Sequence, residues 1–175
     1  MKTKLNQSKL KLAIASAIVA GSMGLSSTSY AAVATGTMTV STSVAVACAM
    51  SVTGNIAFSA YDQTAGEDLQ STGTMTSTCT SGGAAVITMS QGTTPHTSST
   101  AAVPVRQMTN GAGKLKYYLY GDSGYSTAWG DTSGTGKSIT GTGSLQTFTA
   151  YAEITAEQAV ISGTYNDSVA VTLTY

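Results

Sequence analysis

The sequence predicts an all-β fold, an antiparallel β-sandwich, on three observations. Apolar residues recur at every second position along several segments, which is the spacing that places side chains on one face of a strand. These segments are short and are separated by turns rich in Gly, Ser, Thr and Asn. No segment has a clear helical pattern, and no repeat with a period of about 20 to 50 residues indicates a solenoid. Short strands joined by turns are typical of a sandwich.

The first 31 residues are predicted to be a signal peptide (residues 1–31) rather than part of this fold. Several lysines precede an apolar run over residues 12–25, which is too short to span a bilayer and leads to the small-residue motif Ser29-Tyr30-Ala31. We expect cleavage after Ala31, or alternatively after Ala32. A membrane anchor is the competing interpretation, which the shortness of the run disfavours. The mature chain is then one domain's worth of residues and is expected to be exported.

The longest alternation runs from residue 36 to residue 52 and passes through Cys48. Its even positions are mostly apolar, and its odd positions are Thr, Ser and Ala. This is long enough for two strands, so we divide the mature chain into an N-terminal segment (residues 32–47) and a domain (residues 48–175). A short strand is expected at Ile56 and Phe58.

Six further strands are predicted after this segment. They are expected at residues 70–79, 84–90, 103–108, 114–120, 145–154 and 165–175. The pair Asn110-Gly111 predicts a hairpin between the third and fourth of these strands. Residues 121–144 are rich in Gly, Ser and Thr and are expected to form a long loop anchored by Trp129. A single helical turn is expected at residues 155–159.

Composition excludes some classes of function. Removing the signal peptide leaves four basic and eight acidic residues, a net charge of −4. Recognition of nucleic acid depends on clustered Lys and Arg, so no nucleic-acid partner is expected. Only 9% of the whole sequence is charged, where about a quarter is usual, and Thr, Ser, Gly and Ala take the place of charge. This composition favours an extracellular protein that contacts copies of itself over a freely soluble enzyme.

The two cysteines predict a disulfide. Cys48 and Cys79 are the only cysteines, and export takes them to an oxidising compartment. Two cysteines allow one intramolecular pairing, so we predict a Cys48–Cys79 bond. With two thiols and a single histidine, His96, the chain is not expected to bind a metal or another cofactor.

No pattern of catalytic residues is found, and an enzyme is not expected. Residues 133–138 (SGTGKS) resemble the end of a phosphate-binding loop, but Asp131 stands where that loop needs its first glycine. The motif G-x-S-x-G of serine hydrolases does not occur. Tyr117, Tyr118 and Tyr120 are interpreted as packing on a sheet, with a sugar-binding surface as the less favoured interpretation.

Three segments carry a family likeness. They are residues 116–120 (KYYLY), residues 129–131 (WGD) and residues 163–175 (GTYNDSVAVTLTY). Together with the two cysteines 31 residues apart, they resemble the spore coat protein U domain, a family that includes the Csu-type pilins of archaic chaperone–usher systems. The resemblance covers nearly the whole mature chain, and the final strand is its most specific part.

The resemblance implies an incomplete immunoglobulin-like antiparallel β-sandwich, which lacks its last strand and is completed by a donor strand. It implies a periplasmic chaperone and an outer-membrane usher as partners, and other pilin subunits as neighbours in a homopolymer. The product would be a surface fibre for attachment and biofilm formation. The donor side chains would share one face of the N-terminal segment: Met38, Val40, Val44 and Val46. The acceptor groove, which also binds the chaperone, would use the odd face of the last strand: Val169, Val171, Leu173 and Tyr175.

Two alternatives stay open. The chain could be a monomeric secreted coat or matrix protein of the same domain family, in which residues 36–46 are the domain's own first strand and complete the sandwich. It could instead be a tip adhesin. A tip subunit is expected to carry a second, receptor-binding domain, so one domain with a long N-terminal strand favours a shaft subunit.

Overall fold

The computed structural model describes residues 31–175, so the predicted signal peptide lies outside the described residues except for Ala31. The chain divides into a unit that ends at Ser41 and a unit from Thr42 to Tyr175. Residues 31–41 form neither strand nor helix and are exposed. The second unit contains eight strands and no helix. Nothing in residues 31–175 forms a helix with the length and apolarity that crossing a membrane requires.

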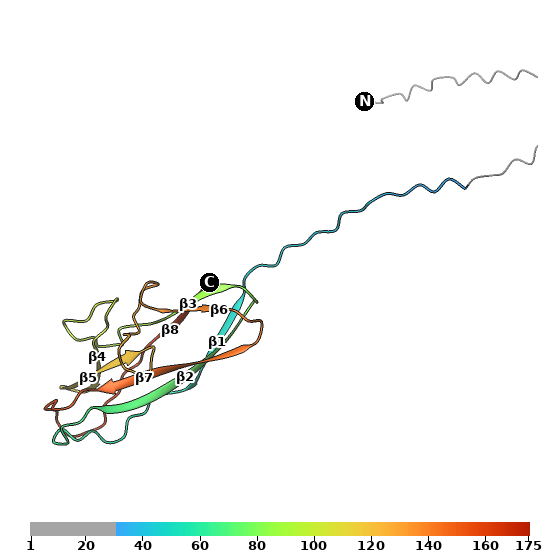
Figure 1. The fold of residues 1–175 in the computed structure, drawn as a ribbon. Coiled ribbons are helices and arrows are strands. Elements are labelled where there is room, and N and C mark those ends of the chain that lie inside the picture. The colour runs from blue at the N-terminus through green and yellow to red at the C-terminus, as the bar shows by residue number, and fades with distance from the viewer. Residues whose placement is uncertain (1–30) are drawn as a thin grey trace, which may run out of the picture. The chain divides into compact units, whose positions relative to one another are not determined.

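Eight strands form two antiparallel sheets, which confirms the all-β prediction (Figure 1). The strands are β1 (Cys48–Gly54), β2 (Leu69–Cys79), β3 (Ala84–Met89), β4 (Arg106–Asn110), β5 (Gly113–Tyr120), β6 (Lys137–Thr140), β7 (Leu145–Ile154) and β8 (Val171–Thr174). The larger sheet has the order β1-β2-β7-β5-β4, and the smaller sheet has the order β6-β3-β8.

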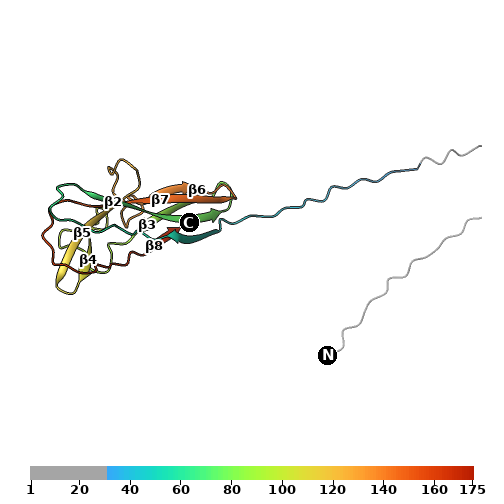
Figure 2. The same ribbon diagram turned by 90° about the horizontal axis from the view of Figure 1, so that it is seen from below.

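The larger sheet is built around β2 and β7, which lie side by side in both views (Figure 1 and Figure 2). They pair from Leu69 opposite Ile154 to Thr78 opposite Leu145. In β2 the odd positions from Gly73 to Cys79 are buried and the threonines between them are not, which is the alternation expected of a strand with one face on the core. The predicted hairpin joins β4 to β5, and Gly111 at its turn has a φ of 57°, a left-handed value that glycine adopts without steric cost.

The core lies between the two sheets and draws on both. The larger sheet contributes Met75, Leu115, Leu119 and Ala152, among others, and the smaller sheet contributes Ala85, Ile87, Met89 and Ile139. Trp129 from the loop after β5 is buried among them, and its indole Nε1–H donates to the carbonyl of Ile87 at 2.8 Å. A buried indole N–H needs such an acceptor, so Trp129 anchors its loop as predicted.

Three local predictions are wrong, and two of them concern segments after β5. Residues 121–144 are not one long loop, because β6 forms within them and pairs with β3. This four-residue strand has one buried apolar side chain, Ile139, and so offers no alternation to detect. Residues 155–159 form no helical turn, and Gln158 there bonds instead to both main-chain groups of Lys116.

The predicted short strand at Ile56 and Phe58 is also absent, although both side chains pack against the core. The cause lies in β1, whose register with β2 shifts between Val52 and Gly54. After that bulge β1 makes one more pair, Gly54 with Thr74, and the chain then leaves the ladder.

The last predicted strand keeps its alternation but is divided between the two sheets. The odd positions from Tyr165 to Leu173 are half-buried, and the even positions are exposed. Only β8 pairs with β3, whereas Asn166 forms a bridge with Thr109 of β4. The chain therefore passes from the larger sheet to the smaller one between residues 166 and 171.

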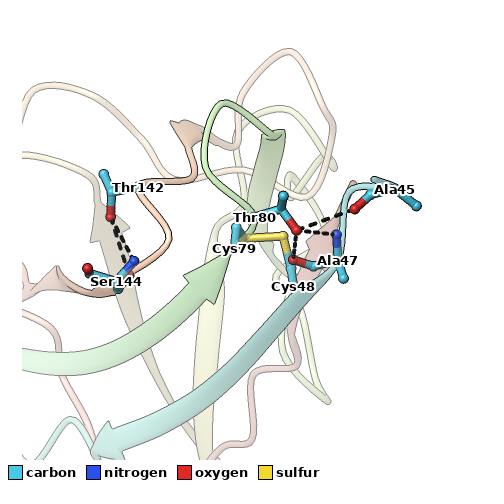
Figure 3. Close-up of a disulfide and its surroundings, with 7 residues drawn as sticks. All are labelled: Ala45, Ala47, Cys48, Cys79, Thr80, Thr142 and Ser144. Carbon is cyan, nitrogen blue, oxygen red and sulfur yellow. Dashed lines mark hydrogen bonds between the residues drawn. A yellow bond between two sulfur atoms is a disulfide. The ribbon is translucent and has the colours of Figure 1, made fainter. Parts of the chain in front are cut away.

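The predicted disulfide is present at one end of the sandwich (Figure 3). Cys48 is the first residue of β1 and Cys79 is the last of β2, and the two are direct partners in the antiparallel register. Their Cα atoms are 4.1 Å apart. The bond therefore ties the edge strand of the larger sheet to its neighbour at the point where the domain begins.

Replacing Cys48 by Ser is expected to lower the free energy of unfolding by about 3 to 4 kcal/mol, because the bond closes a loop over a separation of 31 residues in the unfolded chain. Urea unfolding of the mature chain measures this change, with Ala49→Ser as the matched control on the same strand. Mass spectrometry of non-reduced peptides should show Cys48 linked to Cys79. Free thiols in the exported protein would contradict the prediction.

Candidate functional site

A groove lies between the edges of the two sheets. β1 ends the larger sheet and β8 ends the smaller one, and within residues 42–175 neither has a strand partner on its outer side. A cavity of about 410 Å³ lies between them, lined on one side by residues from the range 52–58 and on the other by residues from the range 165–171. Unpaired strand edges present free N–H and C=O groups, so the groove is a place where a further strand can add.

The floor of the groove is the core itself. It is lined by apolar side chains of both sheets: Met75, Met89, Met108, Tyr117, Leu119 and Ala150. Half of these are methionines, whose flexible and polarisable side chains adapt to the shape of what they contact. A core that is open along one side lacks part of its close packing. The groove is thus suited to receive apolar side chains in a row.

Two of the predicted acceptor residues, Val169 and Val171, line the groove. Leu173 is half-buried and packs against the core cluster. Tyr175 differs from these three, because it is 61% exposed and lies with Thr174 at a second hollow over β3 and β6. The acceptor role of all four remains a prediction.

The predicted donor side chains are exposed. Within residues 31–41, Met38 and Val40 are 89% and 88% exposed, and within the second unit Val44 is 80% exposed. Val46 is 43% exposed and lies over Gly83, where a Cβ would come within 2.8 Å of Val46 Cγ1. No residue from 31 to 47 belongs to a strand.

The domain holds the end of this segment by hydrogen bonds from one residue, Thr80 (Figure 3). Its hydroxyl accepts from the amide of Ala47 at 3.1 Å and donates to the carbonyls of Ala45 and Ala47 at 3.4 and 3.3 Å. The amide of Thr80 also donates to the carbonyl of Ala47 at 2.9 Å. The ordered domain therefore begins a few residues before Cys48.

A buried arginine lies next to the groove, and no sequence pattern predicted its burial. Arg106 is fully buried at the start of β4. Its Nε donates to the carbonyl of Ser90 at 2.7 Å, and its Nη2 donates to the carbonyls of Met89 and Trp129 at 2.8 and 3.0 Å. Burial lowers the pKa of Arg106 to about 10, against the opposing effect of Tyr117, Asp131 and Asp167. The guanidinium fastens the end of β3 to the loop that carries Trp129.

Asp167 and Tyr117 form a polar contact in the groove wall. The Tyr117 hydroxyl donates to Asp167 Oδ2 at 2.7 Å, and both residues line the groove. Burial, together with this bond to Asp167, raises the pKa of Tyr117. The alternation of the last strand could have placed Asp167 on the inner face, because it lies at an odd position between Tyr165 and Val169. Its residue type alone did not single it out, because Asp167 is one of eight acidic residues in the chain.

The other tyrosines of β5 point the opposite way. Tyr118 and Tyr120 lie on the outer face of the larger sheet, where Tyr125 contacts Tyr120 and Tyr151 edge-on at centroid distances of 5.6 and 6.1 Å. Tyr117, by contrast, is part of the core. The three neighbouring tyrosines of the sequence thus serve two different faces, as alternation requires.

The arrangement defines a class of protein: a small all-β sandwich domain whose two sheets leave a gap between their edges. Across residues 31–175, no group of three or more His, Cys, Asp or Glu side chains is placed to hold a metal ion.

The chain belongs to the Spore Coat Protein U domain family, whose profile matches residues 34–172. Protein U of Myxococcus xanthus is 43% identical over 129 residues, which are 70% of this chain and 72% of that protein. The predicted family membership is confirmed. The family takes its name from a coat protein of spores.

A solved structure has a similar fold. It is the crystal structure of the CsuC–CsuE chaperone–tip adhesion subunit pre-assembly complex from the archaic chaperone–usher Csu pili of Acinetobacter baumannii. The TM-score is 0.54 at 20% sequence identity, and the match covers 75% of this chain and 40% of that chain. The present chain thus spans less than half the length of the matched one, and the likeness concerns the fold alone.

The raised pKa of Tyr117 predicts a loss of stability in alkali. An unfolded Tyr loses its proton near pH 10, whereas the folded domain keeps Tyr117 protonated, so the folded state binds more protons above that pH and stability falls as pH rises. We expect Tyr117→Phe to remove about 1.4 kcal/mol of this loss at about pH 11. Urea unfolding of both proteins at about pH 9 and 11 measures it. Arg106 and Tyr120 titrate in both proteins, so an equal pH dependence would contradict the prediction.

Proposed function

We propose that this protein is a structural pilin subunit, which polymerises by donor-strand complementation into a chaperone–usher surface fibre for attachment and biofilm formation. The observation that carries this proposal is the groove between the unpaired edges of β1 and β8, over a floor of core side chains. The same chain carries an exposed apolar stripe with the spacing of a strand. The groove lacks a strand along its open edges, and the apolar stripe lacks a surface that would bury it.

The stripe is long enough to run along the groove, and its side chains are apolar like the floor of the groove. The eleven residues 36–46 reach roughly 35 Å when extended, which is enough to run along a sandwich. Full burial of a Val or Met side chain contributes about 1.5 to 3 kcal/mol, so the four side chains Met38, Val40, Val44 and Val46 together contribute about 6 to 12 kcal/mol before ordering costs. Val46 already contacts Gly83 of its own domain, so its share is the smallest.

The geometry of joining favours a fibre over a closed oligomer. A donor segment and an acceptor groove are different surfaces, so each contact is heterologous and leaves a free donor and a free groove at the two ends. A third hollow, distinct from the one beside Tyr175, lengthens the surface available to a strand, because it shares several lining residues with the groove: Ile56, Phe58, Met108, Tyr165 and Asn166.

A periplasmic chaperone and an outer-membrane usher are the proposed assembly partners. An exposed groove of this kind is an aggregation hazard before polymerisation, so a partner that supplies a temporary strand is needed during export. The fold likeness to a chain from a chaperone–subunit complex supports this partner.

A secreted coat protein is the second candidate, and the family name favours it. In that case the N-terminal segment would complete its own sandwich. The exposure of Val44 and the lack of any strand in residues 42–47 support the first candidate over this one. The oligomeric state of the secreted chain separates the two.

Val40→Asp is expected to stop polymerisation, because a carboxylate would have to enter an apolar groove. Thr39→Asp, on the other face of the same segment, is the matched control and should still form heat-resistant ladders on gels. Deletion of residues 32–46 should give a subunit that caps growing fibres when it is mixed with the intact chain. A truncated domain that stays folded and monomeric without a chaperone, while the intact chain forms no ladders, would contradict the donor role.

Val171→Asp is expected to abolish complexes with the periplasmic chaperone, because Val171 lines the groove beside the edge where the chaperone strand would pair. Leu173→Asp tests the same face of β8 further along. Thr172→Asp is the matched control, since Thr172 is exposed on the opposite face of the strand. Co-purification of each variant with the co-expressed chaperone provides the measurement. Normal yields of assembled Val171→Asp subunit would rule out β8 as the acceptor strand.

A further inference from the structure

The groove wall formed by residues 165–171 has few main-chain bonds. At its start, Asn166 exchanges hydrogen bonds with Thr109 of β4, with N–O distances of 2.9 and 3.2 Å. At its end, the carbonyl of Ala170 accepts from the amide of Ser90 at 2.9 Å, and the amide of Ala170 donates to Ser90 Oγ at 2.8 Å. Between these two points the chain leaves one sheet for the other, and the wall depends on side chains.

The side chain of Asp167 supplies the missing bonds. Its Oδ1 accepts from the amide and the hydroxyl of Thr93 at 2.9 and 2.6 Å, and from the amide of Ser168 at 2.8 Å. Its Oδ2 accepts from the Tyr117 hydroxyl at 2.7 Å. One carboxylate thus joins the C-terminal segment to the loop after β3 and to β5.

The surroundings of Asp167 are fitted to this carboxylate. Gly92 has a φ of 82°, and a Cβ at that position would collide with Asp167 Oδ2, so the loop after β3 approaches as closely as a glycine allows. Arg106 is buried nearby and bonds to the carbonyl of Ser90, the residue whose hydroxyl holds Ala170. A buried positive charge favours a carboxylate in its vicinity over a neutral side chain.

We propose that Asp167 is the positioning residue of the acceptor groove: its carboxylate fixes residues 165–171 at a set distance from the floor, so that the edge of β8 stays open to an incoming strand. This inference rests on the proposed function, since it concerns how the groove is kept ready to bind. It adds a specific role for Asp167 and for its partner Tyr117.

The physical reason is the character of the floor. An apolar floor exposed to water gains free energy when any flexible apolar segment covers it. Val169 and Val171 lie next to that floor, and without the bonds of Asp167 the segment that carries them would be free to move inward. If the wall is fixed in advance, a binding strand does not spend free energy on moving the wall off the floor or on ordering it.

The experiment measures strand binding by the full mature chain, residues 32–175, with Val40→Asp in its own segment so that it does not polymerise and its groove stays free. This parent chain keeps the wild-type residue at every position tested below. A fluorescent synthetic peptide of residues 32–47 is the probe, and its association rate is followed by anisotropy. Asp167→Asn and Tyr117→Phe are the test variants. Asp122→Asn is the matched control, because Asp122 also accepts several bonds, from Gly124, Ser126 and Thr127, but lies in the turn after β5 away from the groove lining. Fluorescence of Trp129, the single and buried tryptophan, reports whether the core is intact.

We expect Asp167→Asn and Tyr117→Phe to slow association by about tenfold or more, a change of about 1.4 kcal/mol in the barrier, while Trp129 emission stays native and Asp122→Asn binds as wild type. Association at the wild-type rate in both variants would overturn the positioning role and leave the proposed function standing. Loss of native Trp129 emission in both variants would also overturn it, because Asp167 would then be needed for the fold as a whole. Failure of the parent chain to bind the peptide would overturn the proposed function and this inference with it.

Discussion

The unpaired edges of β1 and β8 are the constraint on which the rest of the structure depends. Proteins usually protect an edge strand with lysine, proline or a covering segment. Here neither strand contains Lys or Pro, and the floor between them is apolar. A soluble monomer gains nothing from such an opening, whereas a subunit that receives a strand needs an edge without charge. The absence of Lys and Pro from β1 and β8 is therefore what is expected of edges that receive a strand.

Two separate places in the sandwich are held together by different chemistry. The disulfide joins β1 to β2 where the domain begins. Near the end of β3, Arg106 of β4 bonds to the carbonyls of Ser90 and Trp129, and Asp167 of the C-terminal segment bonds to Tyr117 of β5. Between them the interior is apolar and partly open. Since an open core contributes less burial than a closed one, rigid fastenings compensate by limiting the conformations available to the chain.

Strands with regular alternation could be predicted from the sequence, whereas features that depart from alternation could not. β2, β3, β5 and β7 lie within a residue or so of the expected ranges because each has one apolar face. β6 was missed because four residues with a single buried side chain show no period. The roles of Arg106 and Asp167 were missed because charged residues are normally assigned to the surface, and only the fold shows that carbonyls and a tyrosine hydroxyl surround them. The groove arises from strand order, which no local pattern encodes.

The disulfide lies where a pulling force on the N-terminal segment would reach the domain. In the proposed fibre, the N-terminal segment of one subunit is held in the groove of its neighbour, so tension enters the domain where that segment ends. Thr80 holds residues 45–47 there by hydrogen bonds, and Cys48 comes next with its covalent bond to Cys79. Cys79 ends β2, which pairs along nearly its whole length with β7 inside the larger sheet. Without the bond, load on an edge strand would peel it from the sheet one residue at a time. With it, the load passes directly to an inner strand, whose many hydrogen bonds share it.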